Sequence, residues 1–156
     1  MTTKIRAAVL PRARAFACGG DAKKPDAKSA PKALELTKLG LKVDAPAGSE
    51  VSGGIGGGEM VQGPGLVMSV DVASETRPKT IDEAKKDAEM YTPKNIKTET
   101  LGDGWAITFE NEGAAGTNYW VNVRRDIGGK AYWCETTASQ PEQQANALAA
   151  CKSLKK

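Results

Sequence analysis

The feature that most constrains the fold is a series of four short segments in the second half of the chain. Residues 95–101 place Ile96, Thr98 and Thr100 on one face, and residues 105–109 do the same with Trp105, Ile107 and Phe109, as expected for strands. Residues 118–125 and 130–137 are the next two expected strands. Short links that contain Gly, Asp or Asn join these segments. Because parallel neighbours need a crossover of about a dozen residues, links this short predict antiparallel strands.

The first half of the chain adds further strands. Residues 66–72 alternate clearly, and residues 60–62 are expected to pair with them through the turn Gly63-Pro64-Gly65. Nearer the N-terminus, the leucines of residues 34–39 indicate the start of a short helix, followed by a half-buried strand over 39–43.

Two capping boxes predict the positions of two longer helices. Thr80 is followed by Glu83, and Ser139 by Glu142, so each pair has the spacing that closes the first turn of a helix. The second helix carries Cys151 toward the core. We therefore predict an α+β fold in which an antiparallel sheet of six or seven strands packs with two amphipathic helices, as a single domain over residues 33–156.

Two dipeptides in the predicted sheet attract attention. Tyr119-Trp120 and Tyr132-Trp133 recur in facing strands, where we expect aromatic packing between the strands. Arg124 and Arg125 point to opposite faces of their strand, which makes them a poor clamp for one anion, and at least one of them is expected to face water.

Cys134 and Cys151 form the clearest candidate pair. One lies in an apolar strand and the other in the helix expected to pack beside it. The chain has no Cys-x-x-Cys motif and no histidine, which argues against a redox or metal site. A structural disulfide is the preferred interpretation and buried free thiols are the alternative. A disulfide requires an oxidising compartment, which agrees with export.

The third cysteine, Cys18, follows an Arg- and Ala-rich N-terminus. Residues 15–20, Ala-Phe-Ala-Cys-Gly-Gly, resemble the end of a bacterial lipoprotein signal, in which the cysteine is lipidated and becomes the mature N-terminus. The segment departs from that pattern because Ala15 stands where Leu is usual, and Arg12 and Arg14 interrupt the apolar region. Residues 1–18 are thus a degenerate signal-like segment, with a free cysteine in a flexible tail as the alternative.

Residues 19–32 are predicted to be a disordered tether, because they contain no large apolar side chain. The charge is also uneven. Residues 1–32 carry eight Lys and Arg against two Asp, whereas residues 33–156 carry 14 Lys and Arg against 17 Asp and Glu. Since a nucleic-acid-binding domain places its basic stripe on the fold, we expect no nucleic-acid partner.

The absence of histidine excludes Ser-His-Asp and Cys-His catalysis. Carboxylates at Asp103, Glu110 and Glu112 are the remaining candidates for acid–base chemistry. Asp103 belongs to a Gly-Asp-Gly turn, where local hydrogen bonding is its usual role, and the two glutamates lie at a strand end. No catalytic residue, cofactor or metal site is therefore predicted.

A glycine-rich run is the candidate contact loop. Its residues are Gly54, Ile55, Gly56, Gly57, Gly58 and Glu59. Glu59 stands where a phosphate-binding loop would need Lys or Gly, and its charge would repel phosphate. The run is predicted to form a hairpin tip that could contact a partner.

Several blocks of residues 39–156 resemble small uncharacterised bacterial lipoproteins. The sharpest element is a strand cysteine followed by a cysteine in a terminal helix that ends in Lys-Ser-Leu-Lys. The other matching blocks are Gly104–Ile107, Asn118–Val121 with Arg124-Arg125, and Gly128–Thr136. The order of elements also looks like the α-β-α sandwich of PsbP-like domains. That likeness implies docking rather than chemistry.

The sequence thus predicts a non-enzymatic, exported domain, lipid-anchored at Cys18, that binds an envelope protein or other extracytoplasmic partner. The expected location is the bacterial cell envelope, tethered to a membrane and facing the periplasm or the exterior. A small carboxylate-dependent hydrolase or a ligand-carrier lipoprotein is the alternative function. A cytoplasmic protein is the alternative location if the N-terminus is not processed.

Overall fold

The computed structural model describes residues 30–156. The predictions for Cys18, for the signal-like segment 1–18 and for most of the tether 19–32 lie outside the described residues. The first strand begins at Lys32, next to the predicted start of the domain.

Nine strands, two α-helices and one short 3-10 turn make up this part of the chain. In order they are β1 (Lys32–Leu36), β2 (Leu41–Ala45), β3 (Glu50–Gly53), η1 (Ile55–Gly57), β4 (Glu59–Gly63), β5 (Leu66–Val72), α1 (Ile81–Glu89), β6 (Lys94–Leu101), β7 (Gly104–Gly113), β8 (Gly116–Ile127), β9 (Lys130–Ala138) and α2 (Pro141–Lys152).

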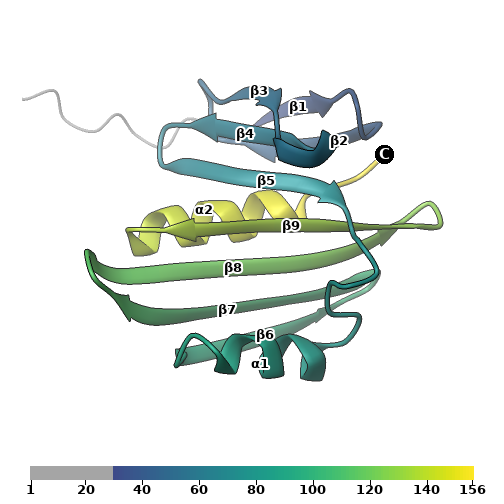
Figure 1. The fold of residues 1–156 in the computed structure, drawn as a ribbon. Helices are drawn as coiled ribbons and strands as arrows, with labels where there is room; N and C mark the ends of the chain where they lie inside the picture. The colour runs from purple at the N-terminus through teal and green to yellow at the C-terminus, as the bar shows by residue number, and fades with distance from the viewer. Residues whose placement is uncertain (1–29) are drawn as a thin grey trace, which may run out of the picture.

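Seven of the strands form one antiparallel sheet in the order β3-β4-β5-β9-β8-β7-β6 (Figure 1). Neighbouring strands are consecutive in the chain everywhere except at β5 and β9, which pair in the middle of the sheet. β1 and β2 pair as a separate antiparallel hairpin. The predicted α+β class, antiparallel sheet and pairing of β4 with β5 are therefore confirmed.

One face of the sheet, which we call the α2 face, is closed along most of its width. Helix α2 packs against β5, β8 and β9, and the β1–β2 hairpin lies beside it. Its core contains aliphatic side chains from both the sheet and its cover, among them Leu36, Val43, Val70, Val123, Ala147 and Leu154, all at most 1% exposed. This is the larger of the two cores, and it includes both Cys134 and Cys151.

The opposite face, the α1 face, is aromatic and only partly covered. Ala84 and Ala88 of α1 pack over a cluster on the sheet that contains Trp105, Phe109 and Trp133. The contacts of α1 with the sheet are concentrated on β7. Because β7 is covered on both sides, residues 105–109 are all buried, although their sequence alternates like a strand with one wet face.

The N-terminal part of the fold differs from the prediction. Residues 32–36 form β1 and pair with β2, so the short helix expected over 34–39 is wrong. The leucine spacing there fits a helix and a strand equally well over so few residues. The pairing with β2, which buries Leu36 in the core, decides for the strand.

The two helix starts also differ in how well they were predicted. Thr80 caps α1 as expected, since its hydroxyl accepts a hydrogen bond from the Glu83 amide at 3.2 Å. In α2 the N-cap is Gln140 rather than Ser139, and the Gln140 side chain makes no capping hydrogen bond. Pro141 explains the shift because its fixed φ favours the first helical position, one residue later than the capping-box spacing implies.

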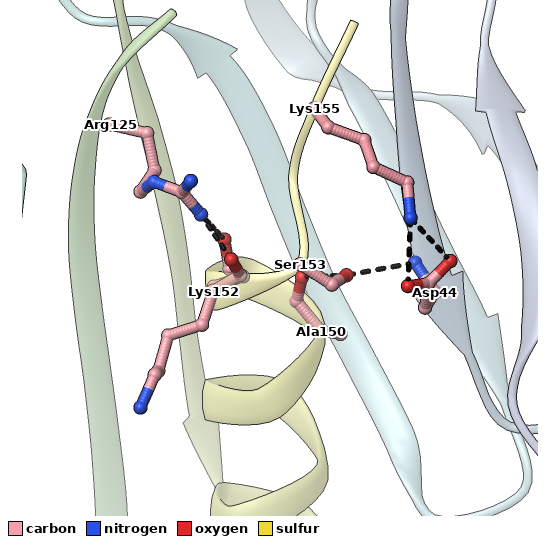
Figure 2. Close-up of polar contacts among 7 residues, drawn as sticks. Asp44, Arg125, Ala150, Lys152, Ser153 and Lys155 are labelled. Carbon is pink, nitrogen blue, oxygen red and sulfur yellow. Dashed lines mark hydrogen bonds and ion pairs between the residues drawn. The ribbon is translucent and has the colours of Figure 1, made fainter. Parts of the chain in front are cut away.

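The C-terminus ties α2 to the β1–β2 hairpin (Figure 2). The Ser153 hydroxyl donates to the Ala150 carbonyl at 2.7 Å and accepts from the Asp44 amide at 2.8 Å. Lys155 pairs with the Asp44 carboxylate at 3.0 Å, and its backbone bridges to Lys42 of β2. We call this group of contacts the C-terminal latch.

Candidate binding groove

The partly covered α1 face forms a groove between α1 and the open strands β4 and β5. Two adjoining hollows of about 390 Å³ and about 90 Å³ share Trp120, Asn122 and Glu135, which therefore lie on a common floor. These three side chains come from β8 and β9, in the middle of the sheet. The groove exists because α1 is short and covers only the β7 side.

Aromatic rings line the α1 end of the groove. The Trp120 ring stacks on Phe109 of β7 with centroids 5.4 Å apart, and Tyr91 lies 4.5 Å from Trp120. The predicted packing between the two Tyr-Trp dipeptides is wrong. Tyr119 faces Ala138, and the partner of Trp133 in β8 is Arg124, so the register separates the dipeptides.

An arginine, a glutamate and a tryptophan form a network of polar contacts beside this floor. Arg77 pairs with Glu135 at 2.6 Å, and its guanidinium lies 4.8 Å from the centroid of the Trp133 ring. The Trp133 indole N–H donates to the other oxygen of Glu135 at 2.7 Å. Both oxygens of Glu135 are thus engaged, and the position of the Arg77 charge is held by an ion pair and a cation–π contact.

Asp71 stands on the same face in β5, opposite Trp133. Burial raises the pKa of its carboxyl, and the negative charge of Glu135 raises it further, against the opposing effect of Arg77. Gly58 packs so closely on this carboxylate that an added Cβ would overlap it. Within residues 30–156, Asp71 makes no ion pair, so the carboxylate beside the groove has no direct cationic partner.

The predicted cysteine pair lies on the other side of the sheet. Cys134 and Cys151 are within disulfide-bond distance, with Cα atoms 5.7 Å apart, and both are fully buried. The Met68 sulfur contacts both of them, at 3.7 and 3.8 Å. This geometry fits a structural staple between β9 and α2, because nothing reactive could reach it without opening the core.

The candidate contact loop divides into two parts. Ile55 is 94% exposed at the tip, where Gly56 adopts φ of 77°. Glu59, in contrast, is 3% exposed and accepts hydrogen bonds from the Lys38 and Leu39 amides at 3.1 and 3.2 Å. The buried Glu59 carboxylate therefore binds the backbone amides of the turn between β1 and β2. Contact with a partner stays a prediction for the glycine-rich tip.

The three candidate acid–base carboxylates do not meet at one site. Asp103 forms a two-pronged ion pair with Arg125 at 2.7 and 2.8 Å, and these hydrogen bonds lower the pKa of its carboxyl. Glu110 accepts from Asn95 at 2.9 Å, and Glu112 faces Lys94 at 3.6 Å. Asp103 directly precedes β7 and Glu110 is the seventh residue of that strand, so the two lie about 20 Å apart at the usual rise per residue.

Arg125 and Arg124 point to opposite faces, as predicted, but neither is left to water. Arg125 donates to the carbonyls of Cys151 and Lys152 at the C-terminal end of α2, where positive charge is favourable (Figure 2). Arg124 pairs with Asp126 at 3.4 Å, and only 14% of its side chain is exposed.

Sequence reasoning did not find the groove. Its floor residues come from the β8–β9 hairpin, but the walls come from β4, β5 and α1, and only the pairing of β5 with β9 brings these distant segments to the floor. One sequence feature could have pointed to the groove. The dipeptide Tyr-Trp occurs twice in the predicted strands, and a polar residue, Asn122 or Glu135, follows each tryptophan two positions later.

A scan against known protein families finds no match, and no curated protein matches this sequence. Among residues 30–156, no helix is long and apolar enough to cross a membrane. The same part of the chain contains no group of three or more Cys, Asp or Glu side chains placed to hold a metal ion.

Proposed function

We propose that this protein is a non-enzymatic, exported binding domain, anchored to a bacterial membrane by a lipid on Cys18, that docks an envelope protein or other extracytoplasmic partner. The observation that carries the proposal is the buried Cys134–Cys151 pair at disulfide distance. Such bonds persist in secreted and periplasmic proteins and are rare in the reducing cytoplasm.

The chemistry of the carboxylates supports docking over catalysis. Asp103, Glu110 and Glu112 each interact with a nearby polar or basic side chain. The lowered pKa of Asp103 keeps it ionised at neutral pH, which does not suit a general acid. A hydrolase built on these three groups is therefore the weaker proposal.

A ligand carrier is the second candidate, and the groove on the α1 face favours it. About 390 Å³ of open space lies over β5, β9 and β8, lined by both polar and apolar side chains. Small-molecule sites combine these features, although they are usually deeper and more enclosed.

The deciding experiment is the intact mass of the protein from the membrane fraction of its own host, with alkylation before and after reduction. Loss of residues 1–17, an added acyl mass on Cys18 and two further alkylations after reduction would support the proposal. An unprocessed soluble chain with three alkylatable cysteines before reduction would contradict it and favour the cytoplasmic alternative.

A further inference from the structure

The groove on the α1 face has the chemistry of a protein contact rather than of a sealed ligand pocket. Six large apolar side chains are exposed in residues 30–156, and three of them, Val67, Met90 and Tyr91, line the groove. Exposed apolar side chains gathered around one hollow indicate a surface that another protein covers.

The charge around the groove is negative on balance. Asp87 projects from α1 into the smaller hollow, Glu135 lies on the floor and Asp71 stands beside it. The only cation that lines either hollow is Arg77, and its charge is already paired with Glu135. Asp71 and Asp87 have no cationic partner within the described residues.

Asn122 adds a group that can recognise a peptide backbone. Its side chain lines both hollows and makes no hydrogen bond with the rest of the described chain. A carboxamide offers one acceptor and two donors, which match the N–H and C=O of a peptide group. The adjacent aromatic rings of Trp120 and Tyr91, which line the same hollow, can pack on aliphatic stems or cationic heads.

We propose that this groove binds an extended segment of a partner protein that carries Arg or Lys side chains. The cationic side chains of the bound segment lie between the aromatic rings and the carboxylates of Asp71 and Asp87. The Asn122 carboxamide forms hydrogen bonds with the backbone of that segment. This inference rests on the binding role proposed above but not on export, so the two can fail separately.

The test uses the full oxidised chain with its tryptophan indoles labelled with ¹⁵N. The chain has three tryptophans, of which Trp120 and Trp133 line the groove, whereas the Trp105 indole N–H is held by the Lys79 carbonyl at 3.1 Å. The probe is a peptide of about twelve residues in which Arg alternates with Thr, long enough to span the groove. A matched peptide replaces each Arg with neutral citrulline.

The Arg peptide is expected to shift the Trp120 and Trp133 signals, to leave Trp105 in place and to bind about tenfold more tightly than the citrulline peptide. Rising salt should weaken the Arg peptide more than the citrulline peptide. Equal affinity for both peptides, no binding of either, or uniform shifts of all three signals would overturn the proposal.

Two variants locate the effect. Asp87→Asn is expected to weaken the Arg peptide about threefold, and Asp71→Asn with Asp87→Asn about tenfold, leaving the citrulline peptide unchanged. The matched control is Asp82→Asn, which removes the same charge from the outward side of α1 and should change neither affinity. If Asp82→Asn weakens binding as much as Asp87→Asn, the attraction is general and the groove is not the site.

Discussion

The two faces of one sheet differ in how completely they are covered. The α2 face is covered by a helix and a hairpin, linked by a disulfide and closed by the C-terminal latch. The α1 face has one short helix, a cluster of aromatic rings and a groove. The larger core thus lies on one side of the sheet, while the other side keeps an aromatic cluster beside an open groove.

The carboxylates of the two sides show the same contrast. Asp103, at the end of the sheet where α2 stops, has its pKa lowered by hydrogen bonds from Arg125. Asp71, on the α1 face, has its pKa raised by burial and by Glu135. The first charge is satisfied by a direct ion pair, whereas the second has only the opposing effect of Arg77, which is itself paired with Glu135.

The largest expected effect comes from removing the Cys134–Cys151 disulfide in the core of the α2 face. Replacing Cys134 and Cys151 with Ala should lower the free energy of unfolding by about 3 kcal/mol, because the closed loop of 17 residues no longer restricts the unfolded chain. Urea unfolding followed by circular dichroism measures the change. Reductant should lower the stability of the parent chain and leave the double variant unaffected; an equal response of both would show that the stability of the fold does not depend on this bond.

A smaller loss is expected where the glycine-rich tip meets the α1 face. In Gly58→Ala the new Cβ would overlap the Asp71 carboxylate and come within 2.6 Å of the Val70 carbonyl oxygen, at a cost of about 2 kcal/mol. Thermal unfolding measures it. The control is Gly102→Ala, where nothing lies within 4 Å of the added carbon. Equal melting temperatures for both variants would mean that the tip is not packed on Asp71 in solution.

The C-terminal latch should have a local effect of about 1 kcal/mol. Ser153→Ala removes the hydroxyl that accepts from the Asp44 amide, which is then left without this partner. Hydrogen exchange should become faster at Asp44 and along β2 but not in α1. Faster exchange in α1 as well would contradict the view that the two faces open independently.

The smallest effects are two opposite dependences on pH. The lowered pKa of Asp103 means that its ionised form stabilises the fold, so Asp103→Asn should be destabilising near neutral pH, with a difference that disappears as pH falls below 3.8. The raised pKa of Asp71 means that its ionised form opposes folding, so Asp71→Asn should be slightly stabilising near neutral pH and neutral in acid.

Both differences should stay below about 1 kcal/mol, because solvent screens partly exposed charges. Urea unfolding of the two variants and the parent between acid and neutral pH measures them. Two differences of the same sign would remove the electrostatic contrast between the faces.

Prediction from the sequence succeeded where local pattern and local chemistry agree. The alternation in residues 95–137, the Thr80 cap of α1 and the turn at Gly63-Pro64-Gly65 each depend on neighbours in the chain. The Cys134–Cys151 pair was found because the predicted strand and helix were adjacent elements. The N-cap of α2 was misplaced by one residue because Pro141 competes with the capping-box spacing.

Sequence alone was enough to establish an antiparallel α+β fold with a cysteine pair between a strand and a helix, because short links and period-two alternation leave few other arrangements. Which side chains meet on the α1 face depends instead on the tertiary structure. The β8–β9 hairpin pairs Asn122 with Glu135, and the register of β5 against β9 brings Asp71 beside them from a distant segment. Such a register is set by the packing of whole layers, which no local pattern contains.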